Sequence, residues 1–119
     1  MAGMAGHWQL RGYGPYALEE KATATVLGTV GPWYPLEWPE PEIKWALARR
    51  HQGRGFASEA VRAVQRMACE CLPDLRLISL IDRDNAASIR LARAVGATFE
   101  REIPFAGGLF QIFRHPVYP

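Results

Sequence analysis

Residues 42–60, which read EIKWALARRHQGRGFASEA, join an apolar, strand-like run to a helix through a turn that contains two glycines. Gly53 and Gly55 allow a tight turn with accessible amides, because glycine accepts positive φ and lets a ligand approach closely. The helix expected from Phe56 begins with N–H groups that lack partners within the helix, and such donors favour an anion. The stretch therefore predicts a phosphate-binding turn. A plain strand-to-helix turn with solvated arginines is the alternative reading of the same residues.

Two blocks of the sequence, one in the turn described above and one further along the chain, carry motifs of the same protein family. Arg50, Gly53, Gly55 and Ala57 fit the R/Q-x-x-G-x-G/A acetyl-CoA signature of the GNAT N-acetyltransferase superfamily. Residues 84–97, DNAASIRLARAVGA, resemble the N-x-x-S-x-x-L/V-x-x-x-x-G-A/F helix of the same superfamily. Both blocks occur in the right order and at the right spacing, and the chain most resembles the RimJ/RimL-like branch, which acetylates ribosomal proteins.

Length and composition are those of one globular unit. The 119 residues are 49% hydrophobic and 22% charged, which predicts a single domain over residues 1–119. The net charge is only +2 and the arginines are dispersed, so no nucleic-acid partner is expected. No apolar run approaches the roughly 20 residues of a membrane helix, and the first ten residues do not read as a signal peptide. We expect a cytoplasmic protein with no membrane partner.

The cysteines and histidines give no sign of a disulfide or a metal site. Cys69 and Cys71 lie two residues apart in an expected helix and point to different faces, so we interpret them as buried thiols of a reducing compartment. His7, His51 and His115 show no metal-ligand spacing, and no catalytic triad can be read from the order of residues. We therefore expect no metal.

The pattern predicts strands first and then alternating helices and strands. Residues 16–20 and 26–32 are expected to form a hairpin, and residues 32–41, with four prolines and two tryptophans, a semi-rigid loop whose aromatic side chains could wall a pocket. Asp84 or Asn85 is expected to cap the second helix, which Gly96 closes. The other elements are expected as strands over 43–47, 75–81, 98–103 and 109–115 and as helices over 56–72 and 86–95.

This order of elements resembles the GNAT core from its second strand onward, over roughly residues 8–115. The resemblance implies an α/β (α+β) fold with a mixed, mostly antiparallel sheet, two main helices and a splayed central strand pair. The first strand of the family and the one or two helices after it have no counterpart in the residues before Trp8. In the family those helices flank the acceptor groove, so we expect sheet surface to be exposed and the chain to form a homodimer.

The same resemblance implies acetyl-CoA as co-substrate, with its pantetheine arm in the splay and its pyrophosphate on the amides of the turn. The residues implied in cofactor binding are Trp45, Ala46, Leu47, Arg50, Gln52, Gly53, Arg54, Gly55, Phe56, Ala57 and Asn85. For Asn85 the role of helix cap is the alternative, and the two roles can coexist.

Acetyl transfer needs a neutral amine, a polarised thioester carbonyl and a proton for the leaving thiolate. Glu42 matches a position where some family members place a general base, although a solvated strand-end carboxylate is the alternative reading. Many relatives use a tyrosine as the acid at the position of Ala92, so Ser88 or a water molecule would have to replace it. Packing or capping is the alternative role for Ser88.

The favoured function is therefore an N-acetyltransferase that acts on a primary amine by direct attack in a ternary complex. The acceptor stays open among protein N-termini, amino sugars, polyamines and amino-acid-like amines. A non-catalytic acyl-CoA-binding or interaction module derived from a truncated GNAT domain is the main alternative. A nucleotide-phosphate enzyme fits less well, because neither the P-loop nor the dinucleotide fingerprint is present.

Overall fold

The first two strands form the hairpin that the sequence predicts. The structure is a computed structural model that describes residues 12–47 and 55–117, and in it β1 (Tyr16–Glu20) pairs antiparallel with β2 (Thr25–Trp33). The turn between them occupies residues 21–24. It is closed by a hydrogen bond from Ala24 N to Glu20 O at 2.8 Å.

The pairing of β2 extends further than the prolines suggest. Pro32 and Trp33 lie opposite Ile43 and Glu42 of β3 (Glu42–Leu47). The strand therefore runs one residue past its predicted end at residue 32, and the prediction of a loop over residues 32–41 is wrong for residues 32 and 33. The pairing of β2 with β1 reaches only to Val30, which leaves β2 with a partner strand on one side at position 32. A sheet position of this kind tolerates a missing N–H donor. The connecting loop is therefore residues 34–41.

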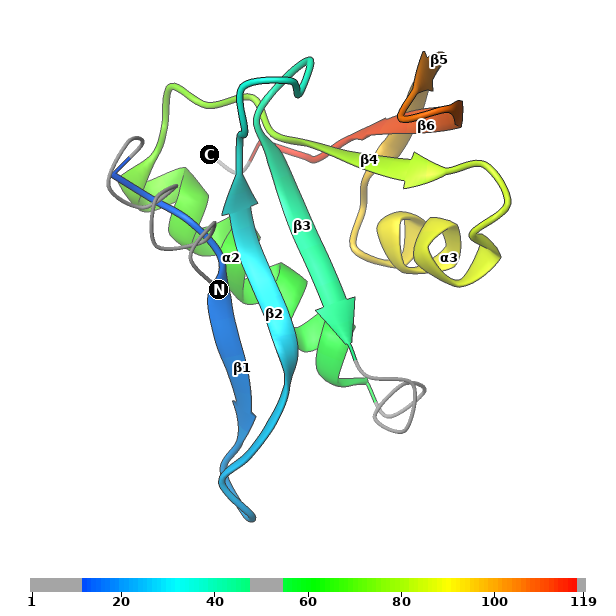
Figure 1. Cartoon of the computed structure of the whole chain (residues 1–119). Helices are drawn as coiled ribbons and strands as arrows, with labels where there is room; N and C mark the ends of the chain where they lie inside the picture. The colour runs from blue at the N-terminus through cyan, green and yellow to red at the C-terminus, as the bar shows by residue number, and fades with distance from the viewer. Residues whose placement is uncertain (1–11, 48–54, 118–119) are drawn as a thin grey trace.

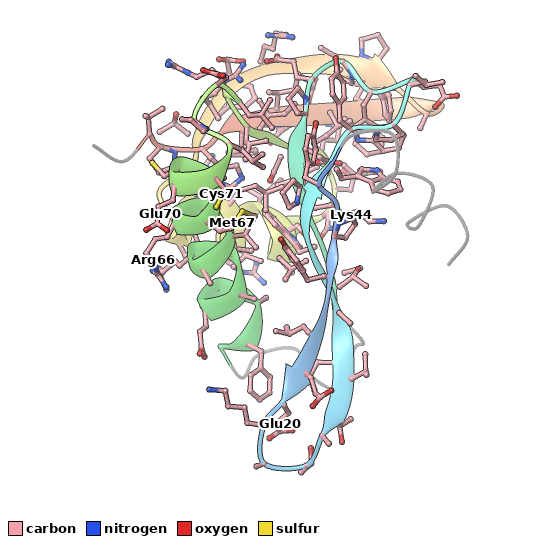
Figure 2. All side chains as sticks on the ribbon, turned by 90° about the vertical axis from the view of Figure 1, so that its left-hand side faces the viewer. Glu20, Lys44, Arg66, Met67, Glu70 and Cys71 are labelled. Atoms are coloured by element: carbon pink, nitrogen blue, oxygen red, sulfur yellow. The ribbon has the colours of Figure 1, made fainter. Side chains whose placement is uncertain are left out.

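One face of α2 (Phe56–Cys71) packs into the core. Its buried residues recur at intervals of three, four or one, as the amphipathic pattern predicts: Ala60, Val61, Val64, Gln65 and Ala68. Cys69 is partly exposed and Cys71 is exposed, and both thiols are free. The expectation of two buried thiols is therefore wrong. Cys71 follows the spacing of Val64 and Ala68, but it is the last residue of α2 and lies beyond the buried part of the helix. Figure 2 shows Arg66 and Glu70 on the opposite side of α2, directed away from the sheet.

The chain then returns to the sheet through β4 (Ile78–Asp82), which is followed by α3 (Ala86–Ala94). The predicted strand began at residue 75, but Leu75 N donates to Leu72 O at 3.0 Å in a turn after α2, so the strand starts later. Beyond α3, Gly96 has φ of +88°, as expected for the residue that closes a helix.

The last two strands, β5 (Thr98–Phe105) and β6 (Gly108–Arg114), form the predicted terminal hairpin. The two residues of its turn, Ala106 and Gly107, both have positive φ, 48° and 79°. This is the conformation of a two-residue type I′ turn, whose twist matches that of the flanking strands.

The six strands form one sheet in the order β1-β2-β3-β4-β6-β5, and every neighbouring pair is antiparallel except β3 with β4. Figure 1 shows α2 behind the β1–β3 half and α3 beside β4. Accordingly, one core cluster joins α2 to β2 and β3, and a second joins α3 to β4 and β6. The predicted fold class is confirmed. Within the described residues, no helix is long and apolar enough to cross a membrane.

Candidate functional site

The sheet opens at its centre, between β3 and β4. Among the described residues these parallel strands pair at one position, Glu42 with Ile78, where Ile78 N donates to Pro41 O at 3.1 Å. Figure 1 shows the two strands diverging from that point toward α3. The predicted splay is therefore present, and a cavity of about 200 Å³ lies in it. Its polar lining residues are Glu42, Lys44, Ser79, Asp82, Asn85 and Ser88.

Glu42 lies where the splay begins, and its side chain is only 6% exposed. Trp38 Nε1 donates to its Oε1 at 2.7 Å, and the backbone N–H of Leu80 donates to its Oε2 at 2.9 Å. Burial raises the pKa of Glu42 to about 7, outweighing the two hydrogen bonds and the charge of Lys44, which favour the carboxylate. The reading as a solvated carboxylate is therefore wrong. A carboxyl group that exchanges its proton near neutrality can act as a general base.

Ser88 stands where this cavity meets a larger one, and it lines both. Its Oγ accepts a hydrogen bond from Trp45 Nε1 at 3.1 Å, which ties α3 to β3. Its backbone N–H donates to Asn85 Oδ1 at 3.2 Å, so the predicted capping role of Asn85 is confirmed. A hydroxyl that accepts one hydrogen bond still carries a proton to donate, so Ser88 can serve as a donor toward the cavity.

The larger cavity, of about 530 Å³, lies between β3, the N-terminus of α2 and α3. It brings together seven residues that the sequence singled out: Trp45, Ala46, Gly55, Phe56, Ala57, Asn85 and Ser88. Five further lining residues were missed: Ser58, Ala87, Arg90, Leu91 and Ala94. A cavity of this size falls within the range of small-molecule and cofactor sites.

Four of the missed residues form one stripe of α3. Ala87, Arg90, Leu91 and Ala94 follow the spacing i, i+3, i+4, i+7, so helical periodicity applied to the second sequence block could have found them. The two alanines leave room in the cavity. Arg90 makes no hydrogen bond or ion pair with any residue that the structure describes. A guanidinium on the wall of a cavity of this size can meet a phosphate.

Of the turn before α2, the structure describes the last residue, Gly55. Its φ is +80°, and among the described residues no atom beyond its chain neighbours lies within 4 Å of a Cβ built on it. Gly55 gives the first amides of α2 no side-chain cap. This confirms the turn glycine expected at position 55. At the other end of the segment, Leu47 is the last residue of β3 and pairs with Gly28. The predicted phosphate contacts at Arg50, Gln52, Gly53 and Arg54 lie outside the described residues.

Aromatic rings from two distant segments gather beside Glu42. Trp38 of the loop packs edge to face against Trp33 and Phe105, with ring centroids 6.3 and 5.1 Å apart, and Phe105 packs in the same way against Phe110 at 5.5 Å. The loop, whose aromatic side chains the sequence predicted as walls of a pocket, is therefore in contact with the tip of the last hairpin. Their rings hold in place the indole that donates to Glu42.

The same loop is fastened to the sheet by Arg114 of β6, which is 24% exposed. Its guanidinium binds Glu40 through two nitrogens, at 2.9 and 3.1 Å, and Glu100 of β5 through two nitrogens, at 2.9 and 3.2 Å. It also donates to the carbonyl of Arg76 at 2.6 Å. Paired bonds of this kind fix geometry as well as add energy, so the cluster fixes the loop that carries Trp38.

The chain is similar to known acetyltransferases in both sequence and fold. The family described as Acetyltransferase (GNAT) domain matches residues 1–98. The chain belongs to this family. A similar protein, YkkB, an uncharacterised protein of Bacillus subtilis (strain 168), is 35% identical over 97 residues, which are 78% of this chain and 56% of YkkB. The chain thus spans little more than half the length of that relative.

Two solved structures have a fold similar to that of this chain. An acetyltransferase from Agrobacterium tumefaciens str. C58 is 28% identical, with a TM-score of 0.85 over 97% of this chain and 70% of that one. The protein yncA from Salmonella typhimurium, solved with its cofactor acetyl-CoA, is 25% identical, with a TM-score of 0.69 over 95% of this chain and 68% of that one. Acetyl-CoA is the acyl donor of the family. No group of three His, Cys, Asp or Glu side chains that could hold a metal occurs within residues 12–47 and 55–117.

Proposed function

We propose that this chain transfers the acetyl group of acetyl-CoA to a primary amine by direct attack in a ternary complex. The observation that carries the proposal is the placement of Glu42, whose pKa is about 7, at the closed end of the splay, next to the cavities. An enzyme that acetylates an amine must remove a proton near neutral pH, and this carboxyl group is suited to do so.

The backbone of β3 offers the co-substrate a partner. Ser79 Oγ donates to Ile43 O, so the carbonyl of Ile43 faces β4. Since backbone groups repeat their direction every second residue along a strand, the N–H and C=O of Trp45 face the same side, where β4 has diverged. An amide-bearing pantetheine arm fits these groups. A backbone N–H there is also the candidate donor to the thioester carbonyl.

The phosphates would lie at the other end of the larger cavity. Gly55 presents open space at the start of α2, and the first amides of that helix favour an anion. Arg90 faces the same cavity from α3 and adds a positive charge. These residues fit the CoA portion of the co-substrate. The similar protein yncA was solved with its cofactor acetyl-CoA, which supports the same ligand for this chain.

The chemistry follows from this placement. Glu42, directly or through a water molecule, takes one proton from the ammonium form of the acceptor. The neutral nitrogen then forms a bond to the acetyl carbon and the carbon–sulfur bond breaks. The proton that the nitrogen loses on becoming an amide passes to the leaving thiolate, which becomes the free thiol of CoA. Ser88 is the proposed donor of the hydrogen bond to the leaving sulfur, because its hydroxyl lies on both cavities and is oriented by Trp45.

The acceptor would enter beside the aromatic rings of Trp38 and Phe105, which lie next to Glu42. A protein N-terminus is one class of acceptor to test, because the sequence resembles the RimJ/RimL-like branch, which acetylates ribosomal proteins. Amino sugars, polyamines and amino-acid-like amines are the other classes to test. The homodimer likewise stays a prediction, which sedimentation would test.

A non-catalytic acyl-CoA-binding module is the second candidate, and one observation favours it. Ala92, which occupies the place of the tyrosine acid of many relatives, is fully buried in the second core cluster, so this position can supply no proton. Binding of acetyl-CoA without transfer to any amine would support this candidate.

The test is titration calorimetry with acetyl-CoA, followed by thiol release in the presence of the four amine classes. We expect saturable binding, release with at least one class, and about tenfold weaker binding for Arg90→Ala, because a charge-assisted hydrogen bond is lost. Arg66→Ala is the matched control, since it removes the same charge from the outer side of α2 (Figure 2). Absence of binding by the wild-type protein would refute the proposed function.

A further inference from the structure

The splay begins where one backbone hydrogen bond is replaced by two side-chain hydrogen bonds. The parallel ladder of β3 and β4 contains the bond from Ile78 N to Pro41 O, at 3.1 Å. In a continuous parallel ladder, a later bond would join Leu80 N to Ile43 O, two residues further along each strand. Neither group makes that bond here, although buried backbone groups need partners.

Each of the two separated groups is bound by a side chain instead. Leu80 N donates to Oε2 of Glu42 at 2.9 Å. Ile43 O accepts a hydrogen bond from Ser79 Oγ at 2.7 Å. The strands can therefore stand apart without leaving a buried donor or acceptor unsatisfied, which would oppose the opening.

The direction of the Ser79 hydroxyl is fixed by a buried chain of hydrogen bonds behind it. Because this hydroxyl donates to Ile43 O, it accepts from His115 Nε2, which lies 2.8 Å away. His115 is then the tautomer whose Nδ1 accepts, and Gln65 Nε2 donates to it at 2.9 Å. The second proton of the Gln65 amide goes to Val95 O at 2.9 Å. Each donor in this chain meets an acceptor.

These hydrogen-bonded side chains are buried, and of the three only Ser79 lines the cavity in the splay. Ser79, His115 and Gln65 are 1%, 5% and 4% exposed. Both ring nitrogens of His115 are taken up by its hydrogen bonds to Ser79 and Gln65. None of the three is suited to exchange protons with an acceptor amine. Their common effect is to hold the proton of Ser79 on the carbonyl of Ile43, at the edge of the gap.

We propose that Ser79, oriented by His115 and Gln65, is a positioning residue that keeps β3 and β4 apart where the acyl arm of the co-substrate enters. The inference rests on the proposed function, since it assigns a purpose to the gap. Without the hydroxyl, Ile43 O would lack a donor, and Leu80 N is the nearest group in the ladder that can supply one. Removing Ser79 Oγ would therefore draw the strands together and narrow the binding site.

The test compares Ser79→Ala with Thr98→Ala, which removes a hydroxyl from the exposed edge strand β5. We expect the affinity of Ser79→Ala for acetyl-CoA to fall about tenfold and its KM for acetyl-CoA to rise to match, while the KM for the amine stays unchanged. Ser79→Thr, which keeps the hydroxyl, should recover most of the affinity. Thr98→Ala should behave as the wild type.

A measurement on the wild-type protein keeps the inference testable if Ser79→Ala does not fold. Couplings across hydrogen bonds, measured by NMR, should connect the Leu80 nitrogen to the side-chain carboxyl carbon of Glu42 and not to the carbonyl carbon of Ile43. A coupling between Leu80 and Ile43 in the wild type would overturn the inference. So would unchanged binding by Ser79→Ala when the wild type binds acetyl-CoA, and the proposed function would then stand. If the wild type does not bind, the proposed function itself fails, and this assignment fails with it.

Discussion

Replacing Glu42 by glutamine should change how the stability of the protein depends on pH. Burial raises the pKa of this carboxyl from 4.5 to about 7 in the folded chain. At about 1.4 kcal/mol per pKa unit, ionising it costs the folded state about 3 kcal/mol. Between pH 4.5 and 7 the folded chain binds more protons than the unfolded chain, so this group lowers the free energy of unfolding as the pH rises. Glutamine does not ionise and removes the effect.

His115 acts in the opposite direction over nearly the same range. Burial, with a smaller contribution from the charge of Arg114, lowers its pKa from 6.5 to about 4. The folded chain therefore binds fewer protons than the unfolded chain between pH 4 and 6.5, and the free energy of unfolding falls as the pH drops through that window. In the wild type the contributions of Glu42 and His115 oppose each other. In Glu42→Gln the contribution of His115 is left alone.

The assay is urea unfolding of both proteins at intervals from pH 4 to pH 8. The free energy of unfolding of Glu42→Gln, minus that of the wild type, should rise by about 3 kcal/mol across this range. Glu70→Gln, which removes a carboxylate from the outer side of α2 (Figure 2), controls for the loss of a surface charge. A difference between Glu42→Gln and wild type that does not vary with pH would refute the reasoning about the burial of Glu42.

Three further outcomes follow from the site and its supports. Glu42→Gln should lower kcat by about 100-fold or more, because the proposed base is lost. In the wild type, kcat/KM should rise with pH to a plateau above about 7, and initial rates at saturating acetyl-CoA would measure both. Arg114→Lys should lose the paired bonds to two carboxylates and about 1 kcal/mol of stability, with a smaller loss in 0.5 M salt, by urea unfolding. Gly55→Ala should cost about 1 kcal/mol in the same assay, because φ is +80° there while space for the methyl group is open.

The order of the elements could be predicted from the sequence because each one depends on local spacing. The apolar stripe of α2, the cap at Asn85 and the turn at Gly107 are set by residues close together in the chain. The errors occurred where distant contacts decide. Residues 32 and 33 stay paired with β3, and the missing N–H of Pro32 is tolerated because β1 does not pair with β2 beyond Val30. Cys71 is exposed because α2 ends there, beyond the buried part of the helix.

The candidate site was predicted where it has a sequence pattern and missed where it depends on tertiary packing. Asn85 and Ser88 belong to a recognisable block and do line the cavities. The burial of Glu42 could not be predicted, because it is produced by Trp38 and by β4, and β4 lies 36 residues further along the chain at the paired position. For the same reason the role of Ser79 has no sequence signal. Ile43 and His115 are each 36 residues from Ser79, and Gln65 is 50 residues from His115.

Glu42 and Ser79 together explain how one point of the sheet can carry a titrating group and keep its shape. Each carboxyl oxygen has more than one lone pair, so Glu42 can take up a proton and still accept the bond from Leu80. That bond weakens when the carboxylate is neutralised, because charged acceptors bind more strongly. The bond from Ser79 to Ile43 does not change with the charge of Glu42, and His115, whose pKa is about 4, stays neutral at the pH where Glu42 titrates. The edge of the gap held by Ser79 should therefore stay in place while Glu42 gains and loses its proton.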